Sequence, residues 1–144
     1  INKAIDSLKN LGKRKNISIM CSCSKGKIVL ADKNALERIL NNLIENAFKY
    51  SDADSTINIS TKKVNDHLEI SVKDSGRGIP NEEQDFLFDR FYRTAEARAT
   101  EEKGSGLGLA IVKNLVNNLN GEVGVKNAKP QGSIFWFTLP LKTS

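Results

Sequence analysis

The sequence contains few cysteine, histidine, proline and tryptophan residues and no long apolar run. Its 144 residues include 2 Cys, 1 His, 3 Pro and 1 Trp. A structural zinc site takes four ligands, mostly Cys and His, so these residues are too few to form one. No apolar run approaches the roughly 20 residues that cross a bilayer as a helix, and the 10 Gly and 3 Pro do not suggest a fibrous or disordered chain. We therefore expect a soluble, folded domain.

Charged residues of both signs are spread along the chain. The 22 Lys and Arg against 17 Asp and Glu give a net charge of +5, without the basic block or interleaved aromatic residues typical of nucleic-acid binding. We therefore expect no nucleic-acid partner. Cys21 and Cys23 would share one face of a strand, where an ordinary disulfide does not form. Reduced cysteines predict a cytoplasmic location.

The apolar pattern predicts a single domain, residues 1–144. Helices are expected at 1–11, at 34–50 with Asp32 or Asn34 as N-cap, at 82–88, and from about Gly108 to Asn120. Strands are expected at 17–21, 27–30, 56–64, 67–74, 122–126 and 133–139. The first two would form a hairpin or edge pair, and a turn at Asn65 and Asp66 would join the next two. This order favours an α/β two-layer sandwich, with helices on one face of a mixed, mainly antiparallel sheet.

Two of the expected helices carry apolar stripes. One stripe comprises Leu36, Ile39, Leu40, Leu43 and Ala47, and the other comprises Leu107, Ala110, Ile111, Leu115 and Leu119. Residues three and four apart share one face of a helix, so both stripes are expected to cover the sheet. The charged segment 94–103 has no such face and predicts a mobile loop.

Asn42, Asn46 and Lys49 are spaced to project from one polar edge of the helix at 34–50. An asparagine amide oxygen suits Mg²⁺, which takes one or two protein ligands and completes its shell with water and phosphate oxygens. Lys49 could then meet phosphate charge. Taken alone, the same spacing also fits an ordinary solvated helix face.

Asp74 ends an expected strand and precedes Gly76 and Gly78, which permit close backbone approach. A buried carboxylate only accepts hydrogen bonds, so it can take the amino hydrogen of adenine but would oppose the O6 acceptor of guanine. The alternative interpretation is a simple Asp-Gly turn. The segment 104–109 is also rich in glycine and enters a helix, whose free N–H groups can bind phosphate. It matches neither the dinucleotide-binding nor the P-loop pattern.

Four segments, in this order, resemble the sequence boxes of the sensor histidine kinases. Residues 42–50 (NLIENAFKY) resemble the N box, 74–80 (DSGRGIP) the G1 box, 88–93 (FDRFYR) the F box and 104–112 (GSGLGLAIV) the G2 box. Residues 132–140 resemble the closing strand of that family. The resemblance covers nearly the whole chain.

The resemblance implies the Bergerat (GHKL) fold, with ATP and Mg²⁺ bound beneath a lid at about 94–105. It makes Asn46 the Mg²⁺ ligand, Asp74 the residue that reads adenine, and Asn42, Lys49 and Arg93 the catalytic residues. The nucleotide-binding residues that it implies are Asn42, Asn46, Lys49, Tyr50, Asp74, Gly76, Gly78, Ile79, Gly104, Ser105, Gly106, Leu107, Gly108 and Leu109.

By the same resemblance, the chain is the catalytic domain of a protein-histidine kinase in two-component signalling. Its partners would be a histidine-bearing dimerisation domain, expected on a segment absent from this chain, and indirectly a response regulator. The chain itself is expected to be monomeric. His67 has no acidic phosphoacceptor motif after it and is expected to be a plain strand or turn residue.

Three alternatives use the same fold. An ATPase clamp needs a general base, but the position one turn before Asn46 is Asn42, which cannot accept a proton at neutral pH. Glu45 points about 100° around the helix from Asn46 and does not replace that base. A degenerate domain that binds ATP as a switch, without transfer, is the second alternative. An anti-sigma-type serine kinase is the third, and Arg93 in a full F box argues against it.

Overall fold

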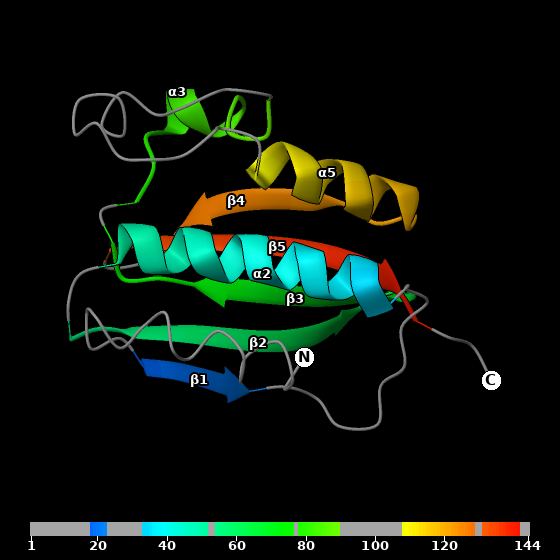
Figure 1. Ribbon diagram of the computed structural model, residues 1–144, viewed down its shortest axis with the longest axis horizontal. Coiled ribbons are helices and arrows are strands. Elements are labelled where there is room, and N and C mark those ends of the chain that lie inside the picture. Colours follow the sequence, from blue (N-terminus) through cyan, green and yellow to red (C-terminus); the bar gives the residue numbers. More distant parts are fainter. Residues whose placement is uncertain are drawn as a thin grey trace.

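The structure, a computed structural model, describes residues 18–22, 33–51, 54–76, 78–89, 108–128 and 131–141. In these residues the strands form one sheet in the order β1-β2-β3-β5-β4. The helices α2 and α5 lie side by side on one face of it (Figure 1). The predicted α/β two-layer architecture is therefore confirmed. The helix predicted at 1–11, the strand at 27–30 and the lid at about 94–105 lie outside the described residues.

The sheet is mainly antiparallel. Its strands are β1 (Ser18–Ser22), β2 (Thr56–Val64), β3 (His67–Lys73), β4 (Val123–Asn127) and β5 (Ser133–Pro140). β1 pairs with β2 in parallel, and the other neighbours pair antiparallel. The predicted hairpin between β2 and β3 is confirmed, and Asn65 takes the positive φ of 54° that its tight turn requires.

The helices are α2 (Lys33–Tyr50), α3 (Asn81–Gln84) and α5 (Gly108–Asn118). Because α2 already begins at Lys33, the prediction of Asn34 as its N-cap is wrong, and Asp32 lies outside the described residues. The short helix predicted at 82–88 is also shorter than expected. Beyond Gln84 the amides of Phe86 and Asp89 bond to carbonyls only three residues back, so the chain continues as tight turns.

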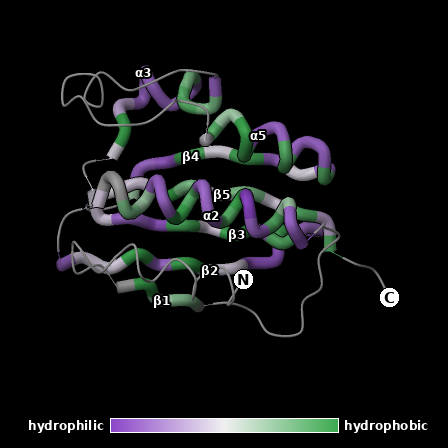
Figure 2. Tube along the Cα trace, in the orientation of Figure 1, coloured by the Kyte–Doolittle hydropathy of each residue, from purple (hydrophilic) through white to green (hydrophobic). Residues whose placement is uncertain are grey.

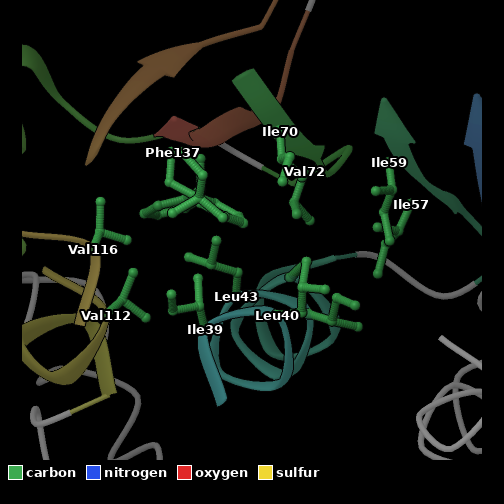
Figure 3. Packing of buried hydrophobic residues seen from close by; sticks show 14 of the residues in the cluster. Ile39, Leu40, Leu43, Ile57, Ile59, Ile70, Val72, Val112, Val116 and Phe137 are labelled. Carbon is green, nitrogen blue, oxygen red and sulfur yellow. The ribbon is translucent and has the colours of Figure 1, made fainter. Parts of the chain in front are cut away.

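The stripe predicted for α2 is confirmed as the centre of the core. Ile39, Leu40 and Leu43 are fully buried and face the sheet residues Ile57, Ile59, Ile70, Val72 and Phe137 (Figure 3). Each fully buried Leu or Ile stabilises the fold by about 1.5–3 kcal/mol. Hydrophobic and hydrophilic residues alternate along the helices and strands, as packing on one side of each requires (Figure 2).

The stripe predicted for α5 is displaced around the helix. Val112 and Val116 are fully buried, whereas Leu115 and Leu119 are only partly buried. The helix packs against α2 as well as against β4 and β5, so the two valines between these neighbours form the seam. Sequence spacing alone could not reveal this second neighbour.

Cys21 is disulfide-bonded in the structure, so the prediction that it is reduced is wrong. That prediction assumed that Cys21 and Cys23 lie in one strand. The strand β1 ends at Ser22, and Cys23 lies outside the described residues. The described helices include none that is long and apolar enough to cross a membrane.

Candidate functional site

The predicted site residues that the structure describes gather at one end of the sheet. At this end β3 finishes before Asp74, α2 finishes at Tyr50, α5 starts at Gly108, and the turn between β4 and β5 closes (Figure 1). The helices α2 and α5 run in opposite directions, and the start of α5 lies beside Asn42 in the middle of α2. This packing brings Asn42 of the N box beside Gly108 of the G2 box, although the two residues are far apart in the sequence.

Asp74 is the buried acid of this site, with only 2% of its surface exposed. Its Oδ1 accepts hydrogen bonds from the backbone N–H of Gly76 at 2.9 Å and of Ser133 at 3.2 Å. Its own N–H donates to Ser133 O at 2.9 Å. With Oδ1 occupied, Oδ2 makes no hydrogen bond to any residue that the structure describes. Among the described residues the carboxylate therefore has one acceptor oxygen left for a ligand, and the two bonds to Oδ1 fix its orientation.

Burial raises the pKa of the Asp74 carboxyl above its ordinary value of 3.8, although the two N–H donors act in the opposite direction. Desolvation of the charged form is the larger effect because the side chain is removed from water on nearly all sides. Perturbed carboxyl groups of this kind gather at functional sites.

Gly78 continues the loop after Asp74 and has a φ of +82°, which favours glycine. A Cβ placed on it would lie 2.9 Å from Asn127 Oδ1 and 3.2 Å from Gly132 O. The next residue, Ile79, donates its N–H to Asn127 Oδ1 at 2.8 Å. The predicted close backbone approach at this glycine is therefore real, and its partner is the turn between β4 and β5.

The polar edge of α2 lies next to the start of α5. Asn42 Nδ2 donates to Arg38 O at 2.9 Å within the helix. Asn42 Oδ1 would lie 3.3 Å from a Cβ on Gly108. One turn further on, Asn46 Nδ2 is buried without a hydrogen-bond partner among the described residues. Glu45 is exposed, so it faces away from this edge.

The N-terminus of α5 points its first N–H groups into the same region. Its first residues are Gly108 and Leu109, and Leu109 packs against the core. Free N–H groups at a helix start, together with the positive end of the helix dipole, favour an anion.

Part of the predicted site is not described. Arg93 and residues 104–107 lie outside the described residues, and for Lys49 and Tyr50 only the backbone of α2 is described. The described part forms two groups. Asn42 lies beside Gly108, with Asn46 and Leu109 following them on the same helices, and the loop of Asp74, Gly76, Gly78 and Ile79 is held by the residues around the β4–β5 turn.

The β4–β5 turn contributes contacts to this loop that the sequence did not predict. Asn127 and Gln131 contact the loop after Asp74 through their side chains, and Gly132 and Ser133 contact it through their backbones. Residues 132–140 were expected only to close the sheet. The adjacent Gly132 and Ser133 were the available signal, whereas Asn127 belongs to no motif.

The described residues contain no group of three or more His, Cys, Asp or Glu side chains that could hold a metal ion. A metal here would depend on amide oxygens and on the ligand's own oxygens. Asn46 fits that role, since the N and O atoms of an amide exchange places by a rotation of 180°. In either orientation of the Asn46 amide, the buried atom at the Nδ2 position has no hydrogen-bond partner among the described residues, and a bound ligand would provide one.

Comparison with known proteins gives the family. The sequence model of the family of histidine kinase-, DNA gyrase B- and HSP90-like ATPases matches residues 31–143. The sensor-like histidine kinase SenX3 of Mycolicibacterium smegmatis is 35% identical over 140 residues, which are 97% of this chain and 36% of that protein. The sensor histidine kinase WalK of Bacillus subtilis is 40% identical over 113 residues, 77% of this chain and 18% of that protein.

Solved structures agree. The mycobacterial sensor histidine kinase MprB superposes with a TM-score of 0.85 and 31% identity, covering 99% of this chain and 97% of that one. Full-length ShkA in complex with AMPPNP also gives a TM-score of 0.85, with 29% identity over 99% of this chain and 29% of that one. The chain therefore belongs to the histidine kinase-, DNA gyrase B- and HSP90-like ATPase family, as a catalytic domain of the sensor histidine kinase type. It spans about a third of the length of SenX3.

Proposed function

We propose that this chain binds Mg²⁺-ATP between α2, α5 and the loop after Asp74, and passes the γ-phosphoryl group to a histidine on a separate dimerisation domain. The observation that carries the proposal is the buried Asp74 carboxylate, whose Oδ1 accepts two N–H groups while Oδ2 makes no hydrogen bond within the part of the chain that the structure describes. Adenine presents an amino donor to such an acceptor, whereas guanine presents its O6 acceptor, which a carboxylate repels. Asp74 thus supports the choice of ATP.

The phosphates would lie toward the N-terminus of α5 and the polar edge of α2. Asn46 would hold Mg²⁺, which neutralises phosphate charge when bound. Gly108 allows the backbone N–H groups of α5 to approach the phosphates, with residues 104–107 before it. Lys49, Arg93 and Tyr50 would complete the site by meeting the phosphates and the nucleotide.

Kinase chemistry is favoured over an ATPase clamp by the contacts of Asn42. Its amide donates to Arg38 O, and an amide cannot take a proton from water at neutral pH. Glu45 is exposed on another side of the helix. Rapid hydrolysis would need a base at this edge, whereas transfer to histidine depends mainly on positioning and charge stabilisation.

In the transfer the bond between the γ-phosphorus and the ADP oxygen breaks, and a phosphorus–nitrogen bond to the acceptor histidine forms. His67 is not the acceptor in this proposal, because it begins β3 whereas Asp74 follows its end, roughly 20 Å away at the rise of an extended strand. Its Nε2 instead lies 3.3 Å from Asn120 O. The proposed partners are the acceptor domain and, indirectly, a response regulator. The proposed location is the cytoplasm, where ATP is found.

The test supplies radioactive γ-phosphate to the chain alone and with the dimerisation domain of the same kinase. Alone, the chain should bind Mg²⁺-ATP, hydrolyse it slowly and stay unlabelled. With the partner, an acid-labile label should appear on the partner, and His67→Gln should leave that label unchanged. Fast turnover by the chain alone, or label on His67, would contradict the proposal. Nucleotide binding without any transfer would favour the switch module.

A further inference from the structure

We propose that Asn127, at the end of β4, is a positioning residue that fixes the loop after Asp74 and thereby sets the preference for adenine. The inference rests on the proposed function, because it gives Asn127 a part in nucleotide recognition. Asn127 itself would not touch the nucleotide. It would act through Ile79 and Gly78.

Ile79 is held at both of its backbone polar groups. Its N–H donates to Asn127 Oδ1 at 2.8 Å, and its carbonyl accepts from Gln84 Nε2 at 3.0 Å. Gln84 Nε2 also lies 3.2 Å from Asn81 Oδ1, which ties this contact to α3. The peptide groups of Ile79 are therefore fixed between the sheet and α3.

Asn127 also closes over Gly78. Its Oδ1 would lie only 2.9 Å from a Cβ at that position, and Gly132 O would lie 3.2 Å away. A side chain at position 78 would therefore collide with Asn127, and the hydrogen bond from Ile79 opposes movement of the loop away from the β4–β5 turn. The Asn127 side-chain oxygen thus lies next to Gly78 and holds the amide of Ile79.

The same turn holds the other end of the loop. Ser133 N–H donates to Asp74 Oδ1 at 3.2 Å, and Gln131 Nε2 donates to Ser75 O at 2.9 Å. Ala128 N–H donates to Gly132 O at 2.9 Å and closes the turn between them. Asp74 and Ile79 are therefore anchored to residues on the two sides of the β4–β5 turn, so releasing Ile79 frees one end of the loop that begins at Asp74.

The experiment compares the wild-type chain with Asn127→Leu, Asn127→Asp and Lys126→Leu. Leucine removes the acceptor at similar size, aspartate keeps an acceptor oxygen, and Lys126→Leu alters the exposed neighbour in β4 as a control. Affinities for Mg²⁺-ATP and Mg²⁺-GTP are measured by titration. Asn127→Leu should weaken ATP binding roughly fivefold to tenfold, as expected for loss of one such hydrogen bond, and should lower the ratio of ATP to GTP affinity. Asn127→Asp should restore the ratio, and Lys126→Leu should not change it.

If Asn127 had a purely structural role, Asn127→Leu would weaken the binding of ATP and GTP equally, and that result would overturn the inference. Unchanged binding by Asn127→Leu would also overturn it, as would failure of Asn127→Asp to restore the ratio.

Hydrogen exchange at the Ile79 amide provides a measurement that does not require the leucine variant to fold. That amide should be protected in the wild type and in Asn127→Asp, and rapid exchange in the wild type would overturn the inference. A wild-type chain without preference for ATP would instead contradict the proposed function itself.

Discussion

The carbonyl oxygen of Asp74 and the α-carbon of Gly132 lie so close together that no side chain fits between them. A Cβ on Gly132 would lie 2.0 Å from Asp74 O and 3.1 Å from Ser75 Cα, and the φ of Gly132 is +103°. Both facts require glycine, because a Cβ would clash with Asp74 and because the positive φ strains other residues. The closing hairpin therefore determines where the buried carboxylate stands.

Gly132→Ala should lower the free energy of unfolding by at least about 2 kcal/mol, since strain at a positive φ alone costs about 1–3 kcal/mol. Because the variant pushes Asp74 away from its place, it should also abolish measurable ATP binding. Urea unfolding and nucleotide titration measure the two effects. Gly108→Ala is the matched control for the unfolding measurement alone, because the nearest contact of its Cβ is the Asn42 side chain at 3.3 Å. Alanine is also the better helix former, so this variant should be as stable as the wild type. Equal stability of both variants would show that Gly132 is not constrained.

Asp74→Asn should weaken ATP binding at least roughly tenfold without unfolding the chain. The new Oδ1 can still accept from Gly76 and Ser133, which places the new NH₂ group where Oδ2 was. That group then faces the amino donor of adenine. Asp66→Asn, in the exposed turn between β2 and β3, makes the same change of charge far from the site. Unchanged ATP affinity of a folded Asp74→Asn chain would remove Asp74 from adenine recognition.

The raised pKa of Asp74 also predicts a dependence of stability on pH. A carboxyl whose pKa is higher in the folded than in the unfolded state favours folding most below the ordinary value of 3.8. This contribution is lost as the pH rises through the raised folded value. Without nucleotide, Asp74→Asn should therefore be at least as stable as the wild type at pH 7, with its advantage shrinking toward pH 4. Urea unfolding across this range tests the sign, and a variant less stable at pH 7 would contradict it.

Asn46→Ala should remove the Mg²⁺-dependent part of ATP binding. Its Nδ2 is buried without a partner among the described residues, so the fold should lose little and the apo chain should remain stable. Titrations with Mg²⁺ and with a chelator should then give the same affinity for the variant and different affinities for the wild type. Glu45→Ala, at the exposed neighbouring position, should retain the Mg²⁺ effect. If the effect survives in Asn46→Ala, the metal ligand lies elsewhere.

Helix α2 shows how much of this site could be predicted from sequence. Its helical period identified both the buried stripe at Ile39 and Leu43 and the polar edge at Asn42 and Asn46, because a single element determines these positions. The loop after Asp74 was recognised as a site, but its anchor at Asn127 was not. That hydrogen bond joins residues 48 positions apart, and only the antiparallel pairing of β5 with both β3 and β4 brings them together.

Helix α5 shows a different limit. Its existence was predicted correctly from period and glycines, whereas its buried face was assigned one position away from Val112 and Val116. A helix in contact with one surface has one apolar face, but α5 touches both α2 and the sheet. Asn120 takes the positive φ of 64° after its end, and a Cβ on Gly121 would lie 1.8 Å from Thr138 O. The predicted end of the helix near Asn120 therefore combines a positive φ with a close backbone approach at Gly121.

Trp136 lies on the sheet face opposite the helices. Gly124 and Trp136 are register partners on β4 and β5, and a Cβ on Gly124 would lie 2.4 Å from Trp136 Cζ2. Gly124→Ala should therefore displace the indole toward solvent and cost about 1–3 kcal/mol of stability, as overpacking does. Trp136 is the one tryptophan of the chain, so a red shift of its fluorescence reports the displacement directly.

Ser71→Ala, at the partner position in β3, removes atoms instead of adding them and should leave the emission unchanged. ATP affinity should remain at the wild-type value, because Phe135 and Phe137 alternate with Trp136 and keep the core on the other face. An unshifted emission in Gly124→Ala would show that the indole does not rest on Gly124.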